Sequence, residues 1–136
     1  MTNTKNVLFV CVENSARSQM AEGFFRKYSK KFMSSSAGTQ PTSALNPLAI
    51  QAMKEIGIDI SNQKPKVISD EMIENSFKIV NMGCMNQESC PSLFVKDILE
   101  WSITDPKAKS LEEVRKIRDH IQLQVLSLIK KLEDVS

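Results

Sequence analysis

The sequence lacks the features that mark membrane-bound, secreted and nucleic-acid-binding proteins. No apolar run approaches the roughly 20 residues that a membrane-spanning helix needs. The apolar run 7–12 is too short to serve as the core of a signal peptide behind residues 1–5. The 18 Lys and Arg residues nearly balance the 16 Asp and Glu residues, and a net charge of +2 predicts no basic surface for nucleic acid. We therefore expect a cytoplasmic protein with no membrane or nucleic-acid partner.

Histidine and cysteine are also scarce, with one histidine, His120, and three cysteines, Cys11, Cys84 and Cys90. In the cytoplasm, cysteines are more often reactive or metal-binding than joined in structural disulfides. A zinc site usually takes four ligands and uses more closely spaced pairs, and His120 falls in a C-terminal helical pattern. The composition therefore favours reactive cysteines and no metal.

The length of 136 residues, with 41% apolar and 25% charged residues, predicts one domain, residues 1–136. Short apolar runs typical of buried strands occur at 7–10, 32–37, 77–82 and 98–101. Helical patterns or caps separate or follow them at 16–31, 46–57, 69–75 and from 110 onward. This order predicts an α/β fold: a single three-layer domain with a four-stranded, mostly parallel sheet and helices on both faces.

Local signals place the ends of several helices. Asn46 before Pro47 is typical of a helix start, and Gly57 is placed to end that helix. Lys30 and Lys31 suit the negative end of the first helix. The last helix begins with a capping box, Ser110-x-x-Glu113.

The strongest chemical signal is the loop that follows the first predicted strand. Five residues separate Cys11 from Arg17, and such a loop can turn its N–H groups inward as a nest for a tetrahedral oxyanion. The next helix adds the positive end of its dipole, and the planar fork of Arg17 can bind two oxygens. In that field a thiol ionises readily, so the pattern predicts a Cys11 thiolate beneath a bound oxyanion. The predicted oxyanion-binding residues are Val12, Glu13, Asn14, Ser15, Ala16, Arg17 and Ser18.

This loop also carries a family resemblance. The motif C-x5-R-S resembles the phosphate loop of cysteine-dependent phosphatases, and its position near the N-terminus, together with Asn14, resembles the low-molecular-weight tyrosine phosphatase fold. The longer run from Asn14 to Gly23, NSARSQMAEG, is similar to the thioredoxin-coupled arsenate reductases built on that fold. Phosphatases of the fold usually have proline where Gln19 stands.

The resemblance implies roles for individual residues. Cys11 is the nucleophile and Arg17 binds the oxyanion. Asn14 and Ser18 hold the shape of the loop, and Ser18 hydrogen-bonds the Cys11 sulfur. Asp105, which precedes a proline, is the general acid for the leaving oxygen; a turn aspartate is the plainer alternative.

The two remaining cysteines have five residues between them and follow the third predicted strand. The arsenate reductases that this chain resembles use such a pair as a redox relay, so the resemblance implies catalytic roles for Cys84 and Cys90. It implies a product disulfide that is passed to thioredoxin, or to glutaredoxin with glutathione. It implies no organic cofactor, and we expect a monomer.

Several positions depart from the family pattern. Glu13 stands where the phosphatases usually have glycine, and Lys107 stands where an aromatic residue often contacts a phosphotyrosine ring, which argues against an aryl phosphate substrate. Many relatives have a second loop cysteine in place of Ala16. Glu22 and Ser36 match a monovalent cation site of some reductases, but Lys66 replaces its acidic group, so a cation is not expected.

Three functions remain open at this point. The leading prediction is reduction of arsenate to arsenite through Cys11, Cys84 and Cys90. The second is hydrolysis of phosphomonoesters through a phosphorylated Cys11, for which the loop and Asp105 would suffice. The third is a protein that binds oxyanions or senses redox state without turnover.

Overall fold

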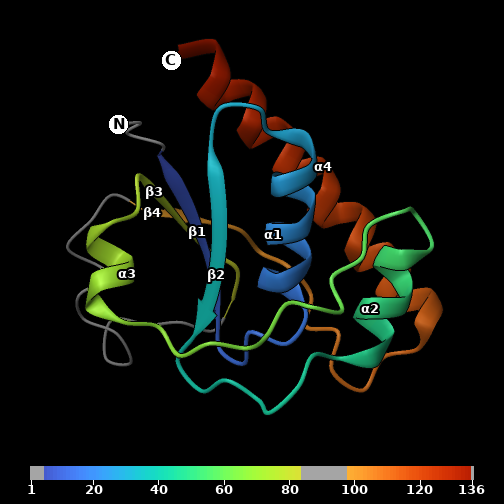
Figure 1. Cartoon of the computed structure of the whole chain (residues 1–136). Helices are drawn as coiled ribbons and strands as arrows, with labels where there is room; N and C mark the ends of the chain where they lie inside the picture. The colour runs from blue at the N-terminus through green and yellow to red at the C-terminus, as the bar shows by residue number, and fades with distance from the viewer. Residues whose placement is uncertain (1–4, 84–97, 136) are drawn as a thin grey trace.

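The computed structural model describes residues 5–83 and 98–135. Its strands are β1 (Asn6–Cys11), β2 (Met33–Gly38), β3 (Lys78–Asn81) and β4 (Ile98–Glu100). They form one sheet in the order β2-β1-β3-β4, and each neighbouring pair is parallel (Figure 1). The predicted α/β fold with a mostly parallel, four-stranded sheet is confirmed.

Strand β1 lies at the centre of the sheet, between β2 and β3. Val7 to Cys11 are all buried, because both faces of the strand are covered. This burial explains the continuous apolar run that the sequence shows there, since central parallel strands lack an exposed face.

Helices cover both faces of the sheet (Figure 1). Helices α1 (Arg17–Tyr28) and α4 (Leu111–Val135) pack together on one side, and α2 (Pro47–Lys54) packs against α4. The short helix α3 (Asp70–Glu74) lies on the other side. The core is divided accordingly: a large apolar cluster includes Phe9, Phe24 and Ile121, and a small one includes Leu8 and Ile73. The predicted three layers are therefore present.

The predicted helix caps are present in the structure. Asn46 accepts a 2.9 Å hydrogen bond from the Leu48 N–H at the start of α2. The turn after α2 ends at Gly57, whose φ of 83° favours glycine. At the start of α4, Ser110 Oγ accepts from the Glu113 N–H at 3.2 Å, and Glu113 accepts from the Ser110 N–H at 3.1 Å. These reciprocal bonds are the capping box.

The prediction for the end of the first helix is wrong. Helix α1 begins at Arg17 and ends at Tyr28 rather than near Lys31, so Lys30 and Lys31 lie beyond its last turn. Ser29 adopts an extended backbone, and its hydroxyl donates to Glu133 at 3.2 Å. This contact with α4 turns the chain away from the helix toward β2.

No helix in the described part of the chain is long and apolar enough to cross a membrane. The longest, α4, carries charged residues along its exposed side and presents an apolar stripe to the core. Val114, Ile121, Val125 and Leu132 form part of that stripe, as the helical spacing predicts.

Candidate oxyanion site

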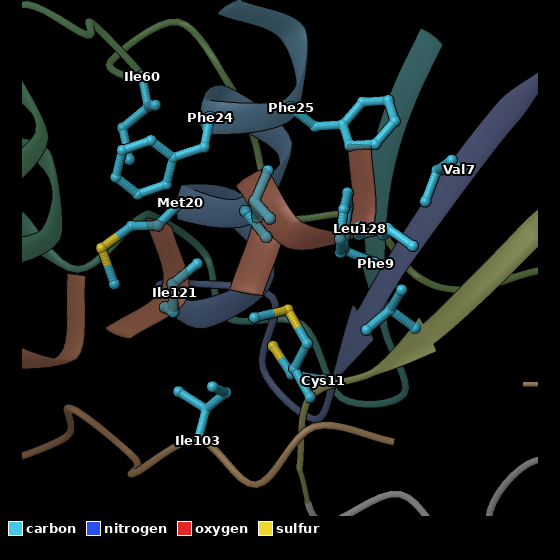
Figure 2. Packing of buried hydrophobic residues seen from close by; sticks show 14 of the residues in the cluster. Val7, Phe9, Cys11, Met20, Phe24, Phe25, Ile60, Ile103, Ile121 and Leu128 are labelled. Atoms are coloured by element: carbon cyan, nitrogen blue, oxygen red, sulfur yellow. The ribbon is translucent and has the colours of Figure 1, made fainter. Parts of the chain in front are cut away.

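Cys11 is the last residue of β1 and lies at the carboxyl edge of the parallel sheet. Its side chain is 2% exposed and forms the edge of the large apolar cluster, near Ile103 (Figure 2). Cys11 pairs in register with Gly38 of β2. A Cβ on Gly38 would lie 2.5 Å from the Val12 carbonyl oxygen and 2.8 Å from that of Cys11, so only glycine allows β2 to approach the loop this closely.

The carbonyl groups of the loop after Cys11 point outward. Those of Val12, Glu13 and Ser15 accept backbone hydrogen bonds from Gln40 (2.8 Å), Thr42 (3.1 Å) and Asn46 (2.9 Å). All described peptide bonds are trans, so the N–H of each peptide unit points opposite to its C=O. The N–H groups of this loop therefore point inward, as a nest for an anion requires.

The amino terminus of α1 adds to this nest. The residue before the helix, Ala16, has no side-chain oxygen to cap the first turn, and that turn contains no acidic residue. The first N–H groups of α1 are therefore not bound by an N-cap side chain, and the positive end of the helix dipole faces the loop. A tetrahedral oxyanion is the ligand that such a terminus binds.

A short chain of hydrogen bonds reaches the Cys11 sulfur from the side. Ser18 Oγ lies 2.9 Å from Cys11 Sγ and accepts a 2.7 Å bond from Asn14 Nδ2. Asn14 Oδ1 accepts from the backbone N–H of Lys66 at 2.9 Å, which fixes the orientation of the Asn14 amide. A Cys11 thiolate has no hydrogen to donate, so in that state Ser18 donates its own hydrogen to the sulfur and stabilises the negative charge.

Asn14 itself has a φ of 51°, a left-handed conformation that asparagine tolerates better than most residues. It is fully buried and its side chain bonds both Ser18 and Lys66. Both interpretations of Asn14, as a left-handed turn residue and as a residue that shapes the loop, therefore hold.

Sequence reasoning missed a second network behind the loop. Gln19 is fully buried, and its Nε2 donates to the Asn14 carbonyl (3.1 Å), to Asn14 Oδ1 (2.9 Å) and to the Lys64 carbonyl (3.0 Å). Its Oε1 accepts from Gln63 Nε2 at 2.7 Å, and Gln63 Oε1 accepts from Arg26 at 2.7 Å. The guanidinium of Arg26 can only donate and the backbone carbonyls can only accept, so the side-chain amides of Gln19 and Gln63 each have one orientation. The sequence offered one signal for this network, because Gln19 stands where phosphatases of the fold usually have proline.

Arg17 is the first residue of α1 and is 6% exposed. Its Nη1 donates to the carbonyls of Met82 (3.2 Å) and Ile103 (3.3 Å). Its Nη2 lies 3.9 Å from Asp105 Oδ2. Arg17 therefore connects the loop to Met82, just after β3, and to Ile103, in the segment after β4. It also lies beside the carboxyl group of Asp105, which can serve as an acid.

Gly83 makes room for this arginine, a role that the sequence did not reveal. A Cβ on Gly83 would collide with Arg17 Nη1, and the φ of 140° at Gly83 is unfavourable for other residues. A cavity of about 540 Å³ opens next to both residues and is lined also by Trp101 and Asp105. Solvent and a small ligand can therefore reach Arg17 and Asp105 from the same side.

Two of the departures from the family pattern contact each other. Lys107 Nζ lies 3.3 Å from Glu13 Oε2, and the side chain of Glu13 is 36% exposed. The Lys107 N–H also donates to Asp105 Oδ1 at 3.0 Å, so Asp105 is both a turn aspartate and a neighbour of Arg17. The pair neutralises Glu13, whose carboxylate would otherwise oppose anion binding.

The residues that match the cation site of some reductases are engaged within the protein. Glu22 accepts a 2.6 Å bond from Ser36 Oγ and lies 3.6 Å from Arg26. Lys66 Nζ donates to the Lys64 carbonyl. Within residues 5–83 and 98–135, no group of three His, Cys, Asp or Glu side chains could hold a metal ion, and His120 is exposed on α4.

Cys84 and Cys90 lie outside the described residues. The last described residue before them is Gly83, which lies against Arg17. Their predicted part in a redox relay therefore stays a prediction.

Comparison with known proteins gives concordant matches over nearly the whole chain. The low molecular weight phosphotyrosine protein phosphatase family matches residues 6–135. An arsenate reductase of Staphylococcus aureus (strain Newman) is 39% identical over 123 residues, which are 89% of this chain and 93% of the relative. A solved arsenate reductase in its phosphate-binding state is 35% identical with a TM-score of 0.85, covering 94% of this chain and 98% of that one. A thioredoxin-dependent arsenate reductase of Corynebacterium glutamicum is 30% identical with a TM-score of 0.82, covering 98% and 64%.

Proposed function

The chain belongs to the low molecular weight phosphotyrosine protein phosphatase family, and on that premise we propose that it is an enzyme that reduces arsenate to arsenite at Cys11. The observation that carries this function is the buried sulfur at the base of the loop, 2.9 Å from Ser18 Oγ. We place the activity in the cytoplasm, where it would serve arsenical resistance, because a reducing compartment keeps the three thiols available.

The first step forms a bond between sulfur and arsenic. Arsenate is bound by the inward N–H groups of the loop, by the amino terminus of α1 and by Arg17. The Cys11 thiolate attacks arsenic, and one oxygen of arsenate leaves. The leaving oxygen is a hydroxyl of arsenate that already carries one proton, and Asp105 donates the second, so it departs as water. Arsenic is still As(V) in the resulting adduct, which the same amides hold.

The second step is the reduction. The Cys84 thiolate attacks Cys11 sulfur, the sulfur–arsenic bond breaks, and its electron pair leaves with arsenic as arsenite. Arsenic is reduced by two electrons, and two thiols are oxidised to a Cys11–Cys84 disulfide. The Cys90 thiolate then attacks Cys84, which frees the Cys11 thiolate and leaves a Cys84–Cys90 disulfide for the external reductant. The two cysteines enter this scheme from the sequence, and the position of Gly83 beside Arg17 supports it.

We propose thioredoxin as that reductant, because the Corynebacterium relative is named as thioredoxin-dependent. The test is steady-state turnover of arsenate with thioredoxin, thioredoxin reductase and NADPH, and in parallel with glutaredoxin and glutathione. The thioredoxin system should support turnover of the native enzyme, and the Cys11→Ser variant should be inactive with both. Turnover with glutaredoxin alone would reject thioredoxin but keep the reductase function, whereas no arsenite with either would reject the function.

The second candidate is hydrolysis of phosphomonoesters, which the shared loop and Asp105 favour. Some hydrolysis of p-nitrophenyl phosphate should accompany the reductase activity, because both reactions use the same anion site. Efficient hydrolysis that Cys84→Ser leaves unchanged, without arsenite formation by the native enzyme, would make the phosphatase the main function.

A further inference from the structure

Glu13 brings a negative charge into a loop that binds anions. It is the third residue of the motif, and the carbonyl of its own peptide unit points outward to Thr42. The carboxylate contacts a lysine from a distant part of the chain, with 3.3 Å between Lys107 Nζ and Glu13 Oε2. The pairing matters for an anion site because a carboxylate with its charge balanced opposes an oxyanion less than an isolated one.

Lys107 also contacts the proposed general acid. Its backbone N–H donates to Asp105 Oδ1 at 3.0 Å, and Asp105 Oδ2 lies 3.9 Å from Arg17 Nη2. Glu13 and Arg17 belong to the same loop, so the contacts form a closed ring from Glu13 through Lys107 and Asp105 to Arg17. The turn that carries Asp105 is therefore tied to both sides of the oxyanion loop.

The turn itself is held in an unusual conformation. Ala108, the residue after Lys107, has a φ of 60°, which costs energy for a residue with a Cβ. Such conformations persist where surrounding contacts determine them. The Glu13–Lys107 contact joins this turn to the oxyanion loop through side chains, and the hydrogen bond from the Lys109 N–H to the Pro106 carbonyl (3.1 Å) closes the turn through the backbone.

We propose that the Glu13–Lys107 pair is a specificity-determining bridge, which balances the loop charge and narrows the site to small inorganic oxyanions. The inference rests on the proposed function. Asp105 protonates the leaving oxygen, so the group attached to that oxygen must lie beside Asp105. In arsenate that group is at most a hydrogen atom. In an aryl ester it is a ring, which would lie near the Lys107 backbone, whose N–H donates to Asp105 Oδ1, and the Lys107 side chain extends from there to Glu13.

The expected effect of breaking the Glu13–Lys107 pair follows from the exposure of its two side chains. The side chain of Lys107 is 71% exposed and that of Glu13 is 36% exposed, so solvent screens the pair. Pairs of this kind change an equilibrium by about 1.5- to 5-fold. Lys107→Ala should therefore weaken oxyanion binding by about two- to fivefold, because it leaves the Glu13 charge unbalanced. In the Glu13→Gln variant, which has no charge at this position, Lys107→Ala should have almost no effect on oxyanion binding.

The experiment is a double-mutant cycle read by inorganic phosphate. Phosphate protects Cys11 from iodoacetamide, and peptide mass mapping reports the modification of Cys11 alone. The proteins are the native chain, Lys107→Ala, Glu13→Gln and the double variant. The matched control is Lys109→Ala, an exposed lysine two residues further on. We expect weaker protection in Lys107→Ala, no such weakening when Lys107→Ala is added to Glu13→Gln, and loss of the difference in about 0.5 M salt.

A second arm measures hydrolysis of p-nitrophenyl phosphate. The double variant, which has lost the Lys107 side chain and the charge of Glu13, should gain kcat/KM for this ester relative to the native enzyme and to Lys109→Ala. An equal effect of Lys107→Ala with and without Glu13→Gln, or an unchanged preference between phosphate and the ester, would overturn the proposal. Neither readout uses Cys84, Cys90 or arsenate, so failure here is distinct from failure of arsenate reduction in the native enzyme.

Discussion

Ser18 Oγ lies 2.9 Å from Cys11 Sγ while it accepts a 2.7 Å hydrogen bond from Asn14 Nδ2. The acceptance from Asn14 leaves the single hydroxyl hydrogen of Ser18 available, and Ser18 donates it when Cys11 is a thiolate, which has no hydrogen of its own. The backbone N–H of Lys66 orients the Asn14 amide, so the direction of the Asn14–Ser18 bond is set by a group that can only donate. Nucleophilic chemistry at Cys11 therefore depends on residues outside the C-x5-R motif.

Removal of the Ser18 hydroxyl should make Cys11 less reactive. A hydrogen bond to a charged group contributes about 1.5–3 kcal/mol, so Ser18→Ala should slow alkylation of Cys11 at pH 6 by about tenfold or more. The measurement is the iodoacetamide rate at Cys11 by peptide mass mapping. Ser43→Ala, at an exposed serine, is the control. An unchanged rate in Ser18→Ala would contradict the donation from Ser18 to the Cys11 thiolate.

The network behind the loop should respond to a change of one atom at Gln63. Gln63→Glu keeps an acceptor for Arg26 but removes the donor to Gln19 Oε1 and to the Gln19 carbonyl. An unsatisfied buried group costs about 1–3 kcal/mol, so the free energy of unfolding should fall by about that amount at pH 8. A protonated carboxyl can donate again, so the loss should be smaller at pH 5.

The control for this variant is Gln51→Glu, at an exposed position of α2. Denaturant unfolding at the two pH values gives both free energies. A loss at Gln63 that does not depend on pH, or one equal to that of the control, would show that Gln63 does not act by donating to Gln19.

Gly83→Ala should displace Arg17. The new Cβ would collide with Arg17 Nη1, and the φ of 140° would cost about 1–3 kcal/mol in a residue other than glycine. We expect kcat/KM for arsenate to fall by about tenfold or more, mainly through KM, because a bidentate grip on the oxyanion is lost. Steady-state kinetics and the melting temperature separate the two effects. A variant that is less stable but has a native KM would contradict the clearance role.

The capping box of α4 should make the free energy of unfolding depend on pH in the acidic range. Hydrogen bonds from the Ser110 backbone and hydroxyl hold the pKa of Glu113 below its ordinary value. The unfolded chain then binds the proton more readily, so the stabilisation is complete above the ordinary glutamate value of about 4.3 and is lost as the pH falls through the folded pKa. Glu113→Gln should flatten this part of the stability curve between about pH 5 and pH 3. Parallel curves for the two proteins would contradict it.

The sequence predicted the fold well because its signals are local. The apolar run of β1 reflects burial on both faces, and Asn46-Pro47 and Ser110-x-x-Glu113 are caps that act within one turn. The end of α1 was missed because it depends on a contact between Ser29 and Glu133, more than a hundred positions apart. Patterns within a window of a few residues cannot report such a contact.

The site was predicted in part for the same reason. The spacing of Cys11 and Arg17 identified the loop, and Glu13 and Lys107 were each recognised as a departure from the family pattern. Their contact was not, because 94 positions separate them. The role of Gly83 was hidden as well, since a glycine in the sequence does not tell which side chain needs the space.

The most direct test of the account is the state of the three cysteines after one turnover without external reductant, read by peptide mass mapping. The native enzyme should release one arsenite per molecule and hold a Cys84–Cys90 disulfide with Cys11 reduced, whereas Cys90→Ser should release one arsenite and hold a Cys11–Cys84 disulfide. Release of arsenite with Cys11 never joined to Cys84 in that variant, or no arsenite from the native enzyme, would contradict the central claim that a Cys11 thiolate carries out the reduction.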